Sequence, residues 1–135
     1  MVDDIHGPIR RLNPPELVTP PGYSQIVEVR GGRIVFIAGQ TAINRDGELV
    51  GKNDFAAQAA QVFKNLAVAL KSVGCTASNL VKLTVFLRQM DDLPVYREAR
   101  DRFFATASPP AAPAVTLVEV SRLYGGIEIE AIAAF

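Results

Sequence analysis

One long amphipathic segment constrains the fold of this chain more than any other feature. Between residues 55 and 73, apolar residues recur at steps of three and four, which places them on one face of an α-helix. Asn53 and Asp54 are residue types that favour a helix N-cap, and Gly74 stands where such a helix needs its C-terminal glycine. A helix with a single apolar face must bury it, so the rest of the chain has to supply the layer beneath.

The C-terminal half supplies strands and a second helix. Residues 81–88 alternate between apolar and polar, which is typical of a strand with one buried face. A second helix is predicted over residues 93–105, followed by a proline-rich breaker at 108–113. Two further strands are predicted at 115–120 and 127–135.

The N-terminal half contains more turn signals and no helical pattern. Residues 1–24 carry five of the nine prolines, so we expect an extended arm with one short strand at 5–12. Two β-rich runs, 26–30 and 33–38, flank a Gly-Gly pair. Because glycine accepts the positive φ of a tight turn, this pattern predicts a β-hairpin between the two runs.

The order of these elements predicts an α+β domain spanning residues 1–135, of the form ββ(β)αβαββ, in which two helices cover one face of a mixed sheet. Several strands carry apolar residues on both sides. Helices on one face alone leave the other face exposed, so we predict that it is buried by oligomerisation.

Charge and composition narrow the possible partners. The 135 residues contain 14 Lys and Arg against 14 Asp and Glu, and the absence of a basic surplus speaks against nucleic-acid binding. The longest apolar run, 34–38, is far shorter than the roughly 20 residues of a membrane span, so no membrane partner is predicted. A single cysteine, Cys75, and an acidic N-terminus favour a reducing cytoplasm over secretion.

Motif spacing alone identifies few catalytic candidates. The only histidine, His6, lies in the proline-rich arm, so a Ser-His-Asp triad or a histidine metal site is unsupported and no metal ligands are predicted. Cys75 is interpreted as a small packed side chain. Glu128 and Glu130 lie on the same side of a predicted strand. That side is either a solvated face or a half-buried one, because apolar residues continue it. On a half-buried face a carboxylate could act as a general acid or base. Tyr23 is equally compatible with packing and with lining a cleft.

Six segments, in order over nearly the whole chain, together resemble the RidA/YjgF family, whose older label is endoribonuclease L-PSP. The segments are residues 22–25 (GYSQ), 36–40 (FIAGQ), 61–66 (QVFKNL), 81–87 (VKLTVFL), 118–123 (VEVSRL) and 127–133 (IEIEAIA). The resemblance implies a chorismate-mutase-like fold of the bacillus type and a homotrimer with three clefts between subunits. It also implies hydrolysis of reactive imines and enamines to a 2-oxo acid and ammonia, with no metal or organic cofactor.

The same resemblance implies which residues bind the small-molecule ligand. Tyr23 and the backbone of Gly39 match cleft positions of the family, and Ala38 replaces a frequent serine. Glu128 matches the residue expected to position the hydrolytic water in the deaminases.

Two further cleft positions depart from the family pattern. Val115 stands where typical members carry an arginine that grips the substrate carboxylate, and Leu117 stands where a cysteine is frequent. Valine has no hydrogen-bond donor, so the chain is placed in a branch that lacks this anchor. Losing such a charged hydrogen bond costs on the order of 2–5 kcal/mol of binding, which predicts a more apolar cleft, a less anionic ligand and poor activity on typical 2-imino acids.

Three functions follow from these features. The first is hydrolysis of small imines, enamines or related C–N bonds by Glu128. The second is a trimeric small-molecule-binding or interaction protein without catalysis, so whether the chain is an enzyme stays open. The third, an endoribonuclease or translation inhibitor, has the least support, because the sequence has neither a histidine pair nor a basic surplus.

Overall fold

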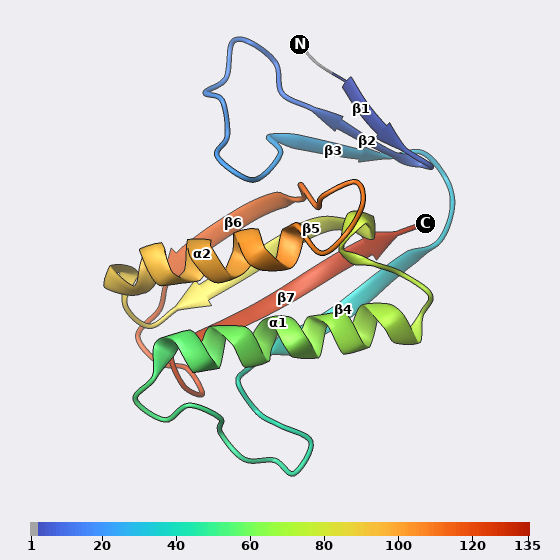
Figure 1. The fold of residues 1–135 in the computed structure, drawn as a ribbon. Helices are drawn as coiled ribbons and strands as arrows, with labels where there is room; N and C mark the ends of the chain where they lie inside the picture. Colours follow the sequence, from blue (N-terminus) through green and yellow to red (C-terminus); the bar gives the residue numbers. More distant parts are fainter. Residues whose placement is uncertain (1–2) are drawn as a thin grey trace.

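The computed structural model describes residues 3–135 and contains two β-sheets and two α-helices (Figure 1). The side chain of His6 lies outside the described part. The smaller sheet is antiparallel and consists of β1 (Asp3–His6), β2 (Ile9–Leu12) and β3 (Ile26–Val29). The larger sheet consists, in spatial order, of β4 (Ile34–Gln40), β7 (Ile127–Ala134), β5 (Leu80–Leu87) and β6 (Ala114–Glu119).

The larger sheet is mixed and carries both helices on one face (Figure 1). Strand β7 pairs antiparallel with β4 and β5, whereas β5 and β6 pair in parallel and are joined through α2 (Leu93–Phe104). The short helices η1 (Ala77–Asn79) and η2 (Met90–Asp92) precede β5 and α2. This arrangement confirms the predicted α+β fold with two helices on one face of a mixed sheet.

Helix α1 (Phe55–Ser72) forms as its periodicity predicts. Asp54 is the N-cap, and its carboxylate accepts a hydrogen bond from the Ala57 N–H at 3.1 Å. Gly74, just past the helix, has a φ of 78°, a conformation that glycine adopts without strain. The apolar face of the helix packs on β4 and β7, where Val62 and Leu66 are fully buried.

The predicted hairpin between β3 and β4 is wrong. Gly31 and Gly32 do have positive φ angles, 84° and 83°, but the strands they join belong to different sheets. The backbone groups beside the turn are already bonded elsewhere: the Arg30 N–H donates to the Pro8 carbonyl at 2.8 Å, and Arg33 exchanges two hydrogen bonds with Phe135. Competition from these partners separates the two strands.

The N-terminal arm also differs from the prediction of one strand. Residues 5–12 contain the end of β1 and the whole of β2, and the chain reverses between them at Gly7, where φ is 58°. Ile9 of β2 and Val27 and Val29 of β3 pack on Val81 and on the end of β7. The small sheet therefore covers one end of the larger sheet, on the face opposite the helices.

The rest of that opposite face is open. Phe36 and Ile34 of β4 are 76% and 55% exposed, although both are large and apolar. No helix within residues 3–135 has the length and apolar character needed to cross a membrane.

Candidate functional site

The residues predicted for the site form two groups, on opposite faces of the larger sheet. Glu128 alternates along β7 with the buried residues Ile127 and Ile129, which face the helices, so Glu128 faces the open side. Val115 and Leu117 of β6 instead pack against the helix-covered core. The first group, which we call the carboxylate surface, is Ala38, Gly39 and Glu128. The second group is Tyr23, Val115 and Leu117.

A bulge in β4 shapes the carboxylate surface. The pairing of β4 with β7 shifts register between Ile37 and Gln40, which places Ala38 and Gly39 at the irregularity. A Cβ at Gly39 would lie 3.0 Å from Cδ of Glu128 and would collide with its Oε2. Only glycine allows the carboxylate to rest on this backbone.

The Glu128 carboxylate is half-buried and unpaired. Residues 3–135 provide it with no hydrogen bond and no ion pair. Its neighbour across the β5–β7 ladder is Phe86, which has no polar group to offer. A carboxylate held in this way can accept a proton from a water molecule or a ligand.

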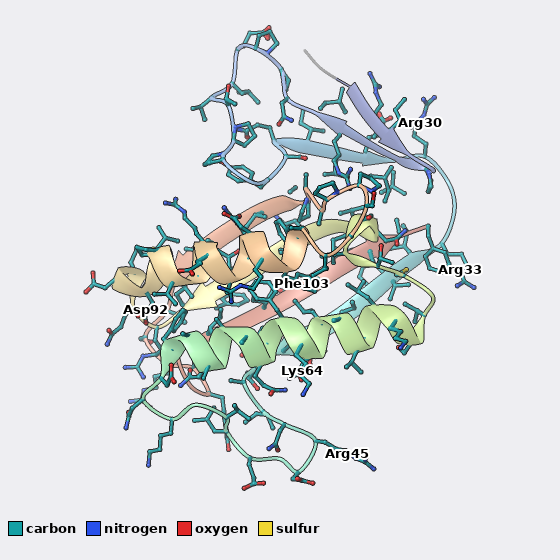
Figure 2. All side chains as sticks on the ribbon, viewed as in Figure 1. Arg30, Arg33, Arg45, Lys64, Asp92 and Phe103 are labelled. Carbon is teal, nitrogen blue, oxygen red and sulfur yellow. The ribbon has the colours of Figure 1, made fainter. Side chains whose placement is uncertain are left out.

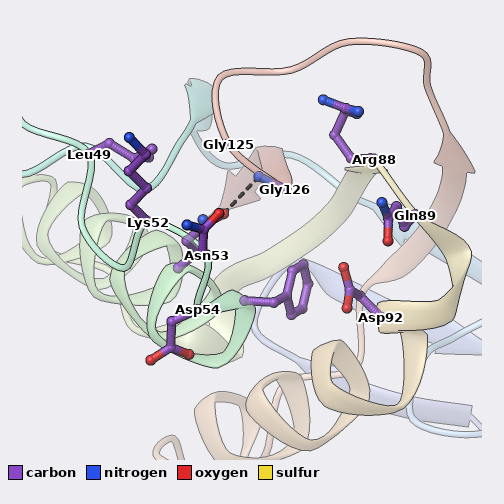
Figure 3. Close-up of a pocket in the computed structure, with 11 residues that line it drawn as sticks. Leu49, Lys52, Asn53, Asp54, Arg88, Gln89, Asp92, Gly125 and Gly126 are labelled. Atoms are coloured by element: carbon purple, nitrogen blue, oxygen red, sulfur yellow. Dashed lines mark hydrogen bonds between the residues drawn. The ribbon is translucent and has the colours of Figure 1, made fainter.

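Gln58 of α1 fixes the start of β7, two residues before Glu128. The Gly126 N–H donates to the buried Gln58 side chain at 2.7 Å, shown by the dashed line in Figure 3, and Gln58 Nε2 donates to the Gly51 carbonyl at 2.9 Å. The Arg88 N–H donates to the Gly126 carbonyl at 3.0 Å. These bonds set where β7 begins and therefore where Glu128 lies.

The same region contains a cavity of about 460 Å³, where β5 ends and β7 begins. Its charged lining residues are Lys52, Asp54, Arg88 and Asp92 (Figure 3). None of the predicted site residues lines this cavity. Two cations and two anions balance one another there, so its charge selects no particular ligand.

The second group lines a smaller cavity of about 210 Å³ beside α2, which we call the α2 pocket. The residues that line it are Tyr23, Leu93, Tyr96, Arg97, Arg100, Val115 and Leu117. Backbone contacts tie the arm to β6 here: the Ser24 N–H donates to the Pro113 carbonyl at 2.9 Å, and the Ser24 hydroxyl donates to the Ala112 carbonyl. These bonds bring Tyr23 beside Val115, although the two are far apart in sequence.

Sequence reasoning missed Arg100. Its side chain is almost fully buried, its Nη2 lies 2.9 Å from Oδ1 of Asp101, and its guanidinium is 5.9 Å from the ring centre of Tyr96. A Cβ at Gly22 would lie 2.6 Å from the same Nη2, so the arm crosses directly over the guanidinium. The signal available in the sequence was the spacing of Tyr96, Arg100 and Phe104, which follow one another at steps of four and so lie on one side of the helix, the side that is buried.

Tyr96 is another residue of the α2 pocket that sequence reasoning did not assign to the site. Burial raises the pKa of Tyr96 to about 12, against an opposing effect from Arg100, so the hydroxyl is protonated at neutral pH. Within residues 3–135 that buried hydroxyl has no hydrogen-bond partner.

The remaining candidates do not form a site. Cys75 is buried, and burial raises the pKa of its thiol, which confirms it as a packed side chain instead of a nucleophile. Among the described residues, no three His, Cys, Asp or Glu side chains gather as metal ligands would.

Comparison with known proteins assigns the chain to a family. The family model described as Endoribonuclease L-PSP matches residues 16–135. The chain belongs to this family. The L-PSP family label and the RidA/YjgF label refer to the same proteins, so the resemblance found in the sequence is confirmed.

The relatives of this L-PSP family chain cover most of its length. A RutC family protein of Pasteurella multocida is 36% identical, over 90% of this chain and 92% of that protein. A mouse protein named 2-iminobutanoate/2-iminopropanoate deaminase is 35% identical, over 82% of this chain and 79% of that protein. A Rid family crystal structure from Yersinia pestis superposes with a TM-score of 0.79, at 35% identity, covering 95% of this chain and 99% of that chain.

Proposed function

We propose that this L-PSP family chain hydrolyses small imines, enamines or related C–N bonds, with Glu128 as general base. The observation that carries the proposal is the half-buried Glu128 carboxylate, which rests on the backbone of Gly39 without a partner in residues 3–135. The mouse relative named as an imine deaminase, at 35% identity, supports the same chemistry.

The reaction takes place in clefts between the subunits of a homotrimer. Within one chain the carboxylate surface and the α2 pocket lie on opposite faces of the sheet, so a small ligand cannot reach both. A neighbouring copy that covers the open face would bring the two together. The exposed Phe36 and Ile34 on that face support such an assembly, because large apolar residues gathered on a surface mark an interaction site.

The chemistry needs one base and one water molecule. Glu128 accepts a proton from the water as its oxygen bonds to the imine carbon, and delivers that proton to the nitrogen, which gives a carbinolamine. Glu128 then moves the hydroxyl proton to the amino nitrogen, the C–N bond breaks, and ammonia and a carbonyl compound leave. The Gly39 backbone orients the reacting group and Tyr23 shapes the pocket. General acid–base catalysis of this kind contributes about 10² to 10⁴ in rate.

Val115 limits the substrate range. The strand β6 offers no donor at this position, so 2-imino acids that depend on a strand-borne arginine should be poor substrates. An arginine at position 115 would restore a bidentate donor at the α2 pocket.

The test supplies the purified protein with an imino acid generated enzymatically in the same vessel and follows ammonia release. Glu128→Gln should lower the rate by about 10² to 10⁴. Glu130→Gln, on the same side of the same strand, is the matched control and should leave the rate nearly unchanged. Val115→Arg should raise it for carboxylate-bearing imines. Full activity of Glu128→Gln would overturn the proposal.

A trimeric small-molecule-binding protein without catalysis is the second candidate. The observation that favours it is the missing donor at Val115, which removes binding energy for the reacting anion. Absence of hydrolysis across a panel of imines, with an intact trimer, would select this function. Ribonuclease activity would need RNA cleavage that responds to a change in Glu128.

A further inference from the structure

The carboxylate surface depends on the bulge in β4. After the bulge, pairing with β7 resumes at Gln40 and Ile129, and β4 has then used three residues against two along β7. In a regular strand Gly39 would lie opposite Ile129, whose side chain is buried in the core beneath the helices. The extra residue therefore keeps Gly39 on the open face, beside Glu128.

The side chain of Asn65 on α1 holds the chain just after the bulge. Its Nδ2 donates to the Thr41 carbonyl at 3.1 Å and to the Ile43 carbonyl at 2.9 Å. An amide NH₂ group has two donors, and these two carbonyls use both. The amide oxygen accepts a hydrogen bond from Gln61, one turn earlier on the helix, at 2.8 Å. The Asn65 amide thus joins α1 to the first residues that follow β4.

Other hydrogen bonds of the loop between β4 and α1 fix different parts of it. The Val50 N–H donates to the Ala42 carbonyl at 2.8 Å, which joins the two limbs of the loop to each other. Gln58 ties the far end of the loop to α1 at Gly51. Asn65 ties the near end, which continues directly from the bulge. A slip of β4 by one residue would carry both acceptor carbonyls of Asn65 along by about 3.3 Å and break both bonds.

We propose that Asn65 is a positioning residue for Glu128. By fixing the register of the chain beyond the bulge, its amide keeps the backbone of Gly39 against the carboxylate. Helix α1 lies on the covered face of the sheet (Figure 1), so Asn65 acts through the bulge and not by contact with the carboxylate. The effect on hydrolysis rests on the proposed function, whereas the effect on the position of Gly39 does not.

The first measurement is nuclear magnetic resonance of the full chain, with the Gly39 amide and the Glu128 side-chain carboxyl carbon as probes. Asn65→Ala should shift both signals, because without Asn65 the regular register, which restores the ladder bonds interrupted at a bulge, competes with the bulged one. Alanine favours a helix more than asparagine does, which helps this variant to fold. Asn65→Ser, which keeps one donor, is the second variant and should shift both signals less. Unchanged signals in either folded variant would overturn the proposal.

Asn79→Ala is the matched control. Asn79 also bonds the backbone through its side-chain amide, because its Nδ2 donates to the Ala134 carbonyl at 3.1 Å and its Oδ1 accepts from the Thr76 N–H at 2.9 Å. Ala134 lies at the other end of β7, about 20 Å from Glu128 at about 3.3 Å per residue. Asn79→Ala should lower the thermal stability and leave the signals of Gly39 and Glu128 in place. Equal shifts in Asn79→Ala and Asn65→Ala would reduce Asn65 to a structural role and overturn the proposal.

The second measurement is ammonia release by the same variants, with kcat and KM determined separately. A misplaced general base affects the transition state more than substrate binding, so Asn65→Ala should lower kcat about tenfold to a hundredfold and change KM less than about twofold. Asn79→Ala should keep both constants. Wild-type kcat in Asn65→Ala would overturn the positioning role. An inactive wild type would contradict the proposed function instead, and the resonance signals would still test whether Asn65 fixes Gly39.

Discussion

The two faces of the larger sheet are built from the same strands and have opposite surroundings. On the helix-covered face Leu83, Val85 and Ile129 are completely buried. On the open face Phe36 is 76% exposed, although it neighbours the buried Ile37 in the same strand. Figure 2 shows Phe103, on the covered side, between the two helices. The chain thus completes one hydrophobic core by itself and leaves large apolar residues exposed on the other face.

This difference bears directly on function. The proposed catalytic group, Glu128, lies on the open face, whereas the α2 pocket with Val115 and Leu117 lies on the covered side. The proposed reaction therefore uses residues from both faces. Changes on the covered face should therefore affect folding, and changes on the open face should affect assembly and catalysis.

The largest effect on folding is expected at Ile37 of β4, in contrast to its neighbour Phe36. Ile37→Ala should lower the free energy of unfolding by about 2–5 kcal/mol, because it leaves a cavity in the core. Phe36→Ala should change it by less than about 0.5 kcal/mol in dilute monomer, because an exposed ring loses little packing. Urea unfolding at several protein concentrations measures both. Equal effects of the two changes would contradict the comparison of the faces.

Phe36→Asp tests whether the open face is the interface between subunits. A charge in the centre of a subunit interface should weaken assembly by at least about 2 kcal/mol, or roughly 30-fold. Sedimentation velocity at micromolar concentration should show monomer in place of trimer. Val68→Asp, on an exposed part of α1, is the control and should assemble like the wild type. A trimer that survives Phe36→Asp would place the interface elsewhere.

Gln58→Ala tests whether a contact on the helix-covered side fixes the start of β7, and with it the position of Glu128 on the open face. The change leaves the Gly126 N–H and the Gly51 carbonyl without their partner, which should cost about 1–3 kcal/mol of stability. Hydrolysis should fall as well, because β7 begins at this contact. Gln61→Ala, which loses only a bond to Asn65 on the same helix, should have a much smaller effect in thermal unfolding and in activity assays.

A further effect on stability is expected at high pH. Burial raises the pKa of Tyr96 to about 12 in the folded chain, whereas an unfolded tyrosine titrates near 10. Below about pH 10 both states keep the proton. Between about 10 and 12 only the unfolded state loses it, so stability should fall by about 1.4 kcal/mol per pH unit through this group. Urea unfolding of the wild type and of Tyr96→Phe at alkaline pH measures the contribution of Tyr96 as the difference between their free energies of unfolding. A difference that does not change with pH would contradict the prediction.

Much of the fold was predictable from the sequence because helix and strand patterns are local. The periodicity over 55–73 gave α1 almost residue for residue, and alternation gave β5 and β7. The hairpin at Gly31 and Gly32 was not predictable, because a glycine turn does not specify which strands pair on either side. Pro8 and Phe135 provided the competing hydrogen bonds, and both are distant in sequence.

The candidate site divides in the same way. Sequence identified Glu128 and the missing donor at Val115, because residue type and motif position are visible in the chain. It missed Arg100, since the role of that residue depends on the arm crossing it at Gly22. Sequence alone therefore determined which elements form and which chemical groups are present. Only the tertiary structure decided which strands pair and which groups share a cavity, because those contacts join residues that no local pattern connects.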